Sequence, residues 1–401
     1  MTKKSDAPAI RFKGFSDTWE QRKFEEIAVR SSVICSDDTL PRVEYEDIVS
    51  GTGRLNKDIY AKQSSKSGIV FHQGDVLYGK LRPYLQNWLL PTFDGLAVGD
   101  FWVLQPQNAD SSFLYRLIQS RQFDEVANQS TGTKMPRADW KLVSKTVFSI
   151  PSNISEQAAI GTYFTALDSL ITLHQRKFEK LTNVKKSMLE KMFPQNGSSY
   201  PEIRFKGFTD PWEQRKLSEM CGTFEYGLNA AAKEFDGKNK YIRITDIDDA
   251  SREFLLSDLS SPDICLDGMS KYLLSSGDIV FARTGASVGK TYIYRENDGI
   301  VYFAGFLIRA KVNQDNDAEF VFQSTLSPSY EKYIRITSQR SGQPGVNAQE
   351  YGEYDLFAPS KEEQQRIGHF LRGIDNLITL HQRELEKLQN IKKSMLEKMF
   401  V

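Results

Sequence analysis

The sequence predicts an α+β protein with two mixed α/β domains and two long helices. Three observations lead to this fold class: an internal repeat, a heptad pattern that closes each half, and short strand and helix signals between the repeated segments. Because each heptad segment follows its own domain, we expect the two helices to pair as an antiparallel coiled coil. The two halves would then be related by a pseudo-two-fold axis.

The repeat consists of two segments that frame each half. IRFKGFSDTWEQRK (10–23) returns as IRFKGFTDPWEQRK (203–216), with 12 identities in 14 positions. The segment 160–193 returns as 367–400, with 23 identities in 34 positions. This is a tandem duplication rather than a solenoid of short repeats.

The stretches between the repeated segments have diverged. Residues 30–150 and 220–358 share little beyond landmarks such as GDVLY (74–78) and GDIVF (277–281). We interpret this contrast as two constraints: the repeated segments meet the same kind of partner surface twice, whereas the variable domains meet two different targets. Exchange of one variable stretch by recombination would leave the same pattern.

The composition is globular and carries no net charge. Of the 401 residues, 40% are hydrophobic and 26% are charged, with 52 Lys and Arg against 52 Asp and Glu. Any nucleic-acid binding must therefore depend on local basic patches. Three widely spaced cysteines (Cys35, Cys221 and Cys265) fit neither a disulfide framework nor a zinc cluster. With no signal peptide or apolar run of about 18 residues, we expect a cytoplasmic protein.

The long helices are expected over 151–196 and 359–401, and each opens on Pro-Ser followed by acidic and Gln residues. Apolar positions then step by four and three from Ile160 and from Ile367, as in a heptad seam. His174 and His381 fall in this seam. We interpret them as polar register markers rather than a metal pair, because no further Cys or carboxylate cluster accompanies them.

Both helices end in KKSMLEKMF, which is either a solvated face or a docking face for a partner. Because all nine residues are repeated, we give the docking interpretation the same weight as the solvated one. The candidate docking residues are Lys185, Lys186, Met188, Met192, Lys392, Lys393, Met395 and Met399.

Each variable domain mixes short strands with a few helices. GIVFHQGDVLYGK (68–80) predicts two strands joined at a Gly-Asp turn, and 272–285 repeats this plan. A helix is expected over 111–129 and another over 318–336, the second interrupted by Pro328. A polar loop and a closing strand follow in each domain.

Basic residues gather in the loops of both variable domains. Residues 51–90 hold six Lys and Arg against two Asp, giving +4; 129–146 hold four against one, giving +3, and 271–295 likewise give +3. Arg and Lys suit guanine edges and phosphates, whereas Asn and Gln suit adenine edges. A charged run is usually a solvated face, but the same arrangement in both halves favours DNA contact. The candidate DNA-binding residues are Lys80, Arg82, Tyr84, Lys134, Arg137, Arg283, Thr284, Ser287, Lys290, Arg340, Gln343 and Asn347.

RTGASVGKT (283–291) comes close to the phosphate-binding signature G-x-x-x-x-G-K-[ST]. It has the Gly289-Lys290-Thr291 ending, but its first glycine, Gly285, comes one place too late. The following TYIYRENDGI predicts a strand rather than the helix that would hold phosphate. We therefore interpret the segment as a basic turn. An NTPase using Lys290 and Thr291 remains an alternative, as does a coiled-coil scaffold with two protein-binding heads.

The order of these features resembles the specificity subunits of type I restriction–modification systems. The resemblance covers the whole chain and rests on the FKGFxDxWEQRK segments, the GD-strand landmarks and the paired EQ…IG…DxLITLHQR…LEKMF helices. It implies two target-recognition domains, each reading half of a bipartite asymmetric DNA sequence. The implied division is 1–150 and 197–358 for these domains, and 151–196 and 359–401 for the spacer helices.

The resemblance also implies partners. The paired helices, each about 60 Å long, would set the gap between half-sites that lie about 34 Å apart. Two copies of a methyltransferase subunit would bring S-adenosylmethionine, and a restriction/translocase subunit would use ATP and Mg²⁺. The chain itself would bind no cofactor and catalyse nothing, in keeping with the absence of an Asn-Pro-Pro-Tyr or Asp-Pro-Pro-Tyr motif from the sequence.

Overall fold

The computed structural model describes residues 8–61, 64–129, 134–195, 197–340 and 342–400. The chain forms two compact units, and we describe each by itself. Unit 1 comprises Met1–His174 with Glu384–Val401, and unit 2 comprises Gln175–Arg383. The boundaries fall inside the long helices α5 (Ile154–Lys191) and α10 (Lys361–Met399) rather than at their starts. The sequence-based division at 151 and 359 therefore follows the elements, whereas each compact unit takes part of both helices.

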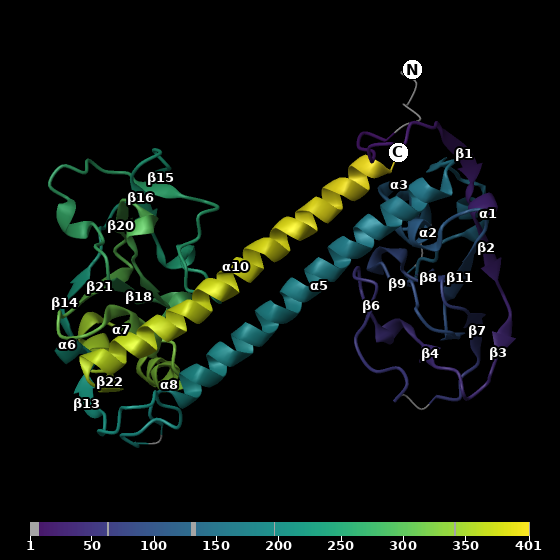
Figure 1. The fold of residues 1–401 in the computed structure, drawn as a ribbon. Helices are drawn as coiled ribbons and strands as arrows, with labels where there is room; N and C mark the ends of the chain where they lie inside the picture. The colour runs from purple at the N-terminus through teal and green to yellow at the C-terminus, as the bar shows by residue number, and fades with distance from the viewer. Residues whose placement is uncertain (1–7, 62–63, 130–133, 196, 341, 401) are drawn as a thin grey trace. The chain divides into compact units, whose positions relative to one another are not determined.

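Unit 1 contains two four-stranded sheets and a closing strand pair (Figure 1). One sheet has the order β2-β11-β8-β9, the other has the order β3-β7-β10-β4, and β1 pairs with β12 beside them. The strands are β1 (Trp19–Lys23), β2 (Ala28–Ser31), β3 (Ile34–Cys35), β4 (Arg42–Val43), β5 (Ile48–Val49), β6 (Arg54–Leu55), β7 (Gly68–Phe71), β8 (Val76–Gly79), β9 (Trp88–Leu89), β10 (Gly95–Ala97), β11 (Phe101–Pro106) and β12 (Val147–Pro151). The helices are α1 (Phe24–Ile27), η1 (Tyr45–Asp47), η2 (Pro83–Leu85), α2 (Ser111–Leu117), α3 (Arg121–Ala127) and α4 (Trp140–Lys145).

Unit 2 repeats the central sheet, with the order β14-β21-β18-β19, and has several two-stranded pairs around it. Its strands are β13 (Glu213–Lys216), β14 (Cys221–Tyr226), β15 (Ala232–Glu234), β16 (Lys240–Ile242), β17 (Ser260–Pro262), β18 (Asp278–Ala282), β19 (Thr291–Ile293), β20 (Val301–Phe303), β21 (Leu307–Val312) and β22 (Asp355–Ala358). Its helices are α6 (Leu217–Met220), η3 (Ile244–Asp246), η4 (Ser270–Tyr272), η5 (Gly285–Ser287), η6 (Glu296–Asp298), α7 (Ala318–Ser324), α8 (Pro328–Thr337) and α9 (Ala348–Gly352).

The Gly-Asp landmarks form the turns expected from the sequence, but they do not join hairpins. The buried Asp75 accepts a hydrogen bond from the backbone N–H of His72 at 2.9 Å, and Asp278 accepts one from Ser275 at 2.9 Å. In unit 1 the strands on either side of this turn, β7 and β8, belong to different sheets. The turn therefore passes the chain from one sheet to the next.

The single helix expected over 111–129 is wrong, because the structure has two helices there, α2 and α3. Ser120 caps the second helix, since its side chain accepts a hydrogen bond from the N–H of Phe123. The equivalent break between α7 and α8 was expected from Pro328, and there Ser327 is the cap. Serine is a weaker break signal than proline, so the first break was missed.

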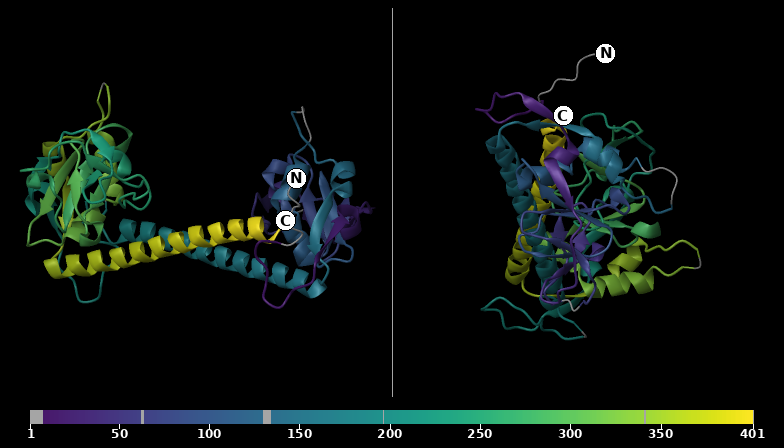
Figure 2. Two further views of the ribbon diagram at one scale, coloured as in Figure 1. Left: turned by 90° about the horizontal axis from the view of Figure 1, so that it is seen from above. Right: turned by 90° about the vertical axis from the view of Figure 1, so that its right-hand side faces the viewer.

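The burial pattern along both long helices follows the expected heptad positions. Every seam position from Ile160 to Met192, and from Ile367 to Met399, is buried or half-buried. Within unit 1 the start of α5 lies beside the end of α10, and within unit 2 the start of α10 lies beside the end of α5 (Figures 1 and 2). The hydrophobic cores of the units include these helix segments.

Equivalent ion pairs link the helix segments within each unit. Lys392 of α10 pairs with Asp168 of α5 at 2.7 Å in unit 1, and Lys185 of α5 pairs with Asp375 of α10 at 2.5 Å in unit 2. In unit 1 the buried Arg116 also pairs with Asp168, at 2.6 Å. Each long helix therefore begins on one unit and ends on the other unit's core.

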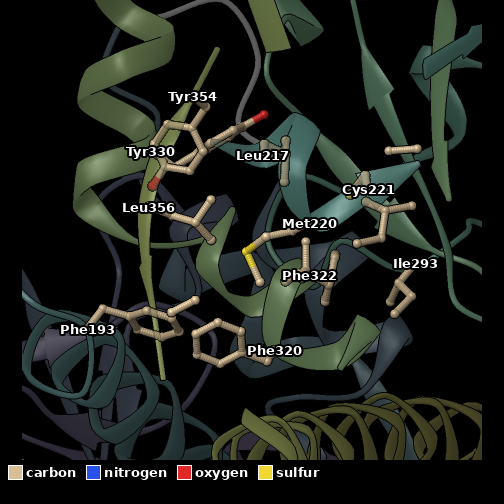
Figure 3. Close-up of a cluster of buried hydrophobic side chains, with 14 of the residues drawn as sticks. Phe193, Leu217, Met220, Cys221, Ile293, Phe320, Phe322, Tyr330, Tyr354 and Leu356 are labelled. Carbon is tan, nitrogen blue, oxygen red and sulfur yellow. The ribbon is translucent and has the colours of Figure 1, made fainter. Parts of the chain in front are cut away.

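The last residues of the helices fill equivalent aromatic positions. Phe193 stacks on Phe320 in unit 2, with ring centroids 5.4 Å apart, and Phe400 stacks on Phe113 in unit 1, at 5.6 Å. Figure 3 shows Phe193 and Phe320 together at the edge of the unit 2 cluster. These contacts give the repeated LEKMF ends a packing role inside the chain.

The short repeated motifs clamp the helix starts. Arg11 donates two hydrogen bonds to the buried Glu156 of α5, at 2.5 and 2.7 Å, and Arg204 donates two to the buried Glu363 of α10, both at 2.8 Å. The pairing raises the pKa of both guanidinium groups. Removing either arginine would leave the charge of a buried glutamate unpaired, which is destabilising. The repeated segments thus contact one another, which is a reason within the chain for their similarity.

The Ile-Gly pair of the motif marks a close approach of the helix to its domain. A Cβ on Gly161 would lie 1.8 Å from the Ser112 hydroxyl, and one on Gly368 would lie 2.6 Å from a carboxylate oxygen of Asp317. A larger residue would push each helix off its domain.

Candidate nucleic-acid interface

In unit 1 the structure brings together two loops that carry candidate DNA-binding residues. The N–H of Arg82 donates to the carbonyl of Pro136 at 2.7 Å, and the N–H of Ala138 donates to the carbonyl of Lys80 at 2.8 Å. Leu81 and Arg137 form a β-bridge between these bonds. The turn after β8 and the loop before α4 are therefore one structural element.

Unit 2 joins its two candidate loops in the same register. The N–H of Gly285 donates to Pro344 at 3.0 Å, and the N–H of Val346 donates to Arg283 at 2.9 Å. Thr284 and Gly345 form the bridge. A third bond also matches, because Lys80 donates to the carbonyl of Asp100 and Arg283 to that of Phe306. We call this pair of joined loops the reading frame of each unit.

The reading frames share one backbone but few side chains. Lys80 corresponds to Arg283, Leu81 to Thr284 and Tyr84 to Ser287. The ends of the turn are left-handed in both units: Gly285 and Gly289 have φ of 71° and 82°, and Arg82 and Gln86 have φ of 49° and 54°. Different side chains on the same backbone suit two different targets.

This turn explains the resemblance of RTGASVGKT to a phosphate-binding loop. Its two glycines stand where the backbone is left-handed. As expected, a strand follows, because β19 pairs antiparallel with β18. Thr291 is fully buried and shares a hydrogen bond of 2.7 Å with Thr325, while Lys290 pairs with Asp249 at 2.5 Å. The NTPase alternative would need an α-helix after Lys290 to hold phosphate, whereas the strand β19 follows there.

Several candidate basic residues pair with carboxylates of the chain. Asp100 lies 3.0 Å from Arg137 and 3.5 Å from Lys80. Burial acts to raise the pKa of Asp100, but the hydrogen bond and charge of Arg137 and the charge of Lys80 bring it below its ordinary value. Arg340 pairs with Glu350 in the other unit. Because carboxylates offset their charge, these side chains make the loops less positive than the sequence suggested.

Other candidates are better placed to meet a ligand. Lys134 and Gln343 are exposed, and the Tyr84 side chain is 56% exposed. The guanidinium of Arg283 lies over the rings of the exposed Tyr226 and Phe306, at 5.1 and 5.8 Å. Arg283 is thus held in place by aromatic faces, and no ion pair with a described carboxylate neutralises it.

Two candidates serve the fold instead. The Asn347 side chain caps α9 by accepting from the N–H of Glu350 at 3.0 Å. Ser287 is buried inside its turn, with 9% of its surface exposed. Both lie in the reading frame of unit 2, so their effect on a ligand would act through the shape of the turn.

Comparison with known proteins bears on this arrangement. The family described as "Type I restriction modification DNA specificity domain" matches residues 209–390. The MjaVIII specificity subunit of a type I restriction enzyme from Methanocaldococcus jannaschii is 24% identical over 78% of this chain and 77% of its own length. The EcoDI specificity subunit from Escherichia coli is 25% identical over 44% of this chain and 42% of its own length. The chain is similar to type I restriction–modification specificity subunits.

A solved structure supports the fold of the chain. The type I restriction–modification S subunit from M. genitalium superposes with a TM-score of 0.67 over 98% of this chain and 99% of that chain, at 15% identity. At this identity the likeness concerns the fold. Within the described ranges no helix is long and apolar enough to span a membrane. The same residues contain no group of three His, Cys, Asp or Glu side chains placed to hold a metal ion.

The candidate docking residues divide into two groups. Met192 and Met399 are buried in the cores, and Lys185 and Lys392 hold the ion pairs between helix segments. Met188 and Met395 are half-buried against the same cores. Exposed positions remain at Lys186 and Lys393. Of the candidate docking residues, these two lysines are therefore the ones that we still propose to contact a partner.

Three residues of the reading frames were missed from the sequence. Asp100 and Phe306 occupy equivalent places before β11 and β21, and Gln86 closes the turn after β8. The two residues before β11 and β21 contribute through partners distant in sequence, so no local signal marks them. Gln86 could have been found by aligning its turn with the glycine-spaced turn of the second half.

Proposed function

We propose that this chain supplies the DNA sequence specificity of a type I restriction–modification complex, with each unit reading one half of a bipartite asymmetric site. The observation that carries this proposal is the repeated reading frame, one backbone with two sets of side chains. Two copies of one frame suit two segments of the same kind of ligand. Different side chains on them make the two half-sites different in sequence.

The long helices have a separate role in the proposal. They form a continuous antiparallel coiled coil that sets the gap between the half-sites. Support comes from the buried seam and from the matching pairs Lys392–Asp168 and Lys185–Asp375. The exposed lysines near the helix ends, Lys186 and Lys393, help to dock two copies of a methyltransferase subunit. A repeated surface suits two copies of one partner.

The chemistry belongs to the partners. The methyltransferase subunits bring S-adenosylmethionine and methylate an adenine in each half-site after flipping it out of the duplex. A restriction/translocase subunit uses ATP and Mg²⁺. This chain has no catalytic role. Its zero net charge and the pairing of Lys80, Arg137 and Lys290 with carboxylates favour weak DNA binding alone, with partners supplying many phosphate contacts.

The proposal is tested by mapping methylated adenine across the genome of the strain that carries the gene, with and without the gene. We expect a two-part asymmetric motif that disappears on deletion and returns when the intact gene is restored. If purified complexes containing this chain methylate DNA without any two-part motif, the proposal is wrong. A chain that assembles with partners but ignores DNA would instead be a scaffold with two protein-binding heads.

A further inference from the structure

The turn in the reading frame of unit 1 holds a backbone conformation that its residues disfavour. Four described residues other than glycine have a left-handed φ, and two of them, Arg82 and Gln86, stand at either end of this turn. Residues with a Cβ pay about 1–2 kcal/mol in this region, whereas glycine does not. The equivalent positions in unit 2 are Gly285 and Gly289. The turn therefore carries this conformational cost in unit 1 but not in unit 2.

Hydrogen bonds fix this turn on both sides. Arg82 and Leu85 are held by backbone bonds, from the Arg82 N–H to Pro136 and from the Leu85 N–H to the Arg82 carbonyl, at 2.7 and 2.8 Å. The N–H of Gly51 donates to the Gln86 carbonyl at 3.1 Å. The backbone therefore explains why the turn is left-handed at its ends, but it does not explain why arginine and glutamine stand there.

The side chains of these two residues are half-buried and make no hydrogen bond to other described residues. The backbone groups of Arg82 and Gln86 make all the hydrogen bonds that join them to other described residues. The Nε atom of Arg82 is buried without a hydrogen-bond partner within the described part of the chain. A strained residue whose side chain makes no hydrogen bond to the described part of the chain points to a function outside the chain.

We propose that Arg82 and Gln86 are the base-reading side chains of unit 1, placed on either side of the exposed Tyr84. This rests on the proposed function. Arginine suits the O6 and N7 acceptors of guanine, and glutamine suits the N6 and N7 groups of adenine. Residues at the two ends of a three-residue turn can reach neighbouring base pairs, while the exposed ring of Tyr84 packs against the DNA between them.

In unit 2 the corresponding side chain comes from another loop. A Cβ on Gly285 would lie 2.9 Å from the Nε2 atom of Gln343, so the space that Arg82 uses in unit 1 is taken by Gln343 in unit 2. The reading side chain there comes from the neighbouring loop of the frame. Glycine at 285 makes room for it.

The test uses Arg82→Gly and Gln86→Gly in the full chain, expressed with its partner subunits. Glycine relieves the left-handed strain, so the melting temperature of the chain is expected to stay unchanged or rise by up to about 2–4 °C. Discrimination of the matching base pair is expected to fall by about 10-fold to 100-fold at one position for each variant. Asn108→Gly is the matched control, since Asn108 is also left-handed but lies outside the reading frame.

The methylated-adenine map of each strain reads out the result. We expect one half of the motif to become degenerate, at a guanine for Arg82→Gly and at an adenine for Gln86→Gly, with the other half and the Asn108→Gly map unchanged. An unchanged motif in both variants would overturn the inference and leave the proposed function standing. A fall in melting temperature with loss of recognition would overturn it too, by showing a structural role. A wild-type map without a two-part motif would instead reject the proposed function itself.

Discussion

Arg283 shows how a single residue can be positioned for a ligand without being neutralised. Its guanidinium lies over Tyr226 and Phe306, whereas its equivalent in unit 1, Lys80, is near the carboxylate of Asp100. Aromatic faces restrain a cation at little cost to its charge. The basic residue at this position therefore lies beside aromatic rings in unit 2 and beside a carboxylate in unit 1.

Replacing Arg283 or Lys134 by alanine is expected to weaken DNA binding of the assembled complex by about 10-fold to 100-fold, because each loses one contact to base or phosphate. Lys134→Ala should also lower the slope of log affinity against log salt by about 1, as for a phosphate contact. Binding is measured by fluorescence anisotropy over a salt series, and assembly by gel filtration. Lys290→Ala is the comparison, with a smaller loss expected because Lys290 is paired with Asp249.

Equal loss of assembly in Arg283→Ala or Lys134→Ala would contradict this reading, because it would make these residues structural. The sequence located the basic loops, since local composition is visible in a short window. It did not reveal which cations are neutralised, because Asp100 and Asp249 come from distant segments. Pairing of this kind depends on the tertiary fold.

At the scale of elements, the repeated segments form clamps at both ends of each long helix. Arg11 and Arg204 hold the buried glutamates at the helix starts, and Phe400 and Phe193 fill the cores at the helix ends. Periodicity predicted the helices and their seam, because a seam is a local pattern. The break between α2 and α3 was missed, because a serine cap such as Ser120 looks like an ordinary polar residue in sequence.

Because both ends of each helix are held, the length of the helices can be changed to test whether it sets the gap between the half-sites. Matching insertions of seven residues after Gln175 and Gln382 keep the heptad seam in register and add about 10.5 Å to each helix. If the helices set the gap, the spacing between the half-sites should grow by about 3 base pairs, at 3.4 Å per base pair. The gap is read from methylated-adenine maps of strains carrying the lengthened chain.

An unchanged gap in a folded, active variant would reject the ruler role of the helices. Insertion into α5 alone serves as the control, since it makes α5 one heptad longer than α10, so that the two helices no longer match in length. That variant should lose methylation rather than shift the gap. Circular dichroism separates loss of fold from loss of function.

At the scale of the whole molecule, the chain consists of two units with the same organisation. Each compact unit combines a variable domain with the start of one long helix and the end of the other. The duplication was visible in the sequence, but the exchange of helix ends was not, because the two copies of LEKMF are identical and give no sign of which core each one fills. The structure assigns Phe193 to unit 2 and Phe400 to unit 1.

The central claim is that each unit reads its half-site with its own reading frame on a shared scaffold. The most direct measurement is the methylated-adenine map of a strain in which 217–360 are replaced by a copy of 24–153, so that both units carry the first frame. Thermal unfolding and gel filtration first establish that the chain folds and assembles. The account predicts a two-part motif whose halves have the same sequence in inverted orientation. A motif that keeps the original second half would contradict it.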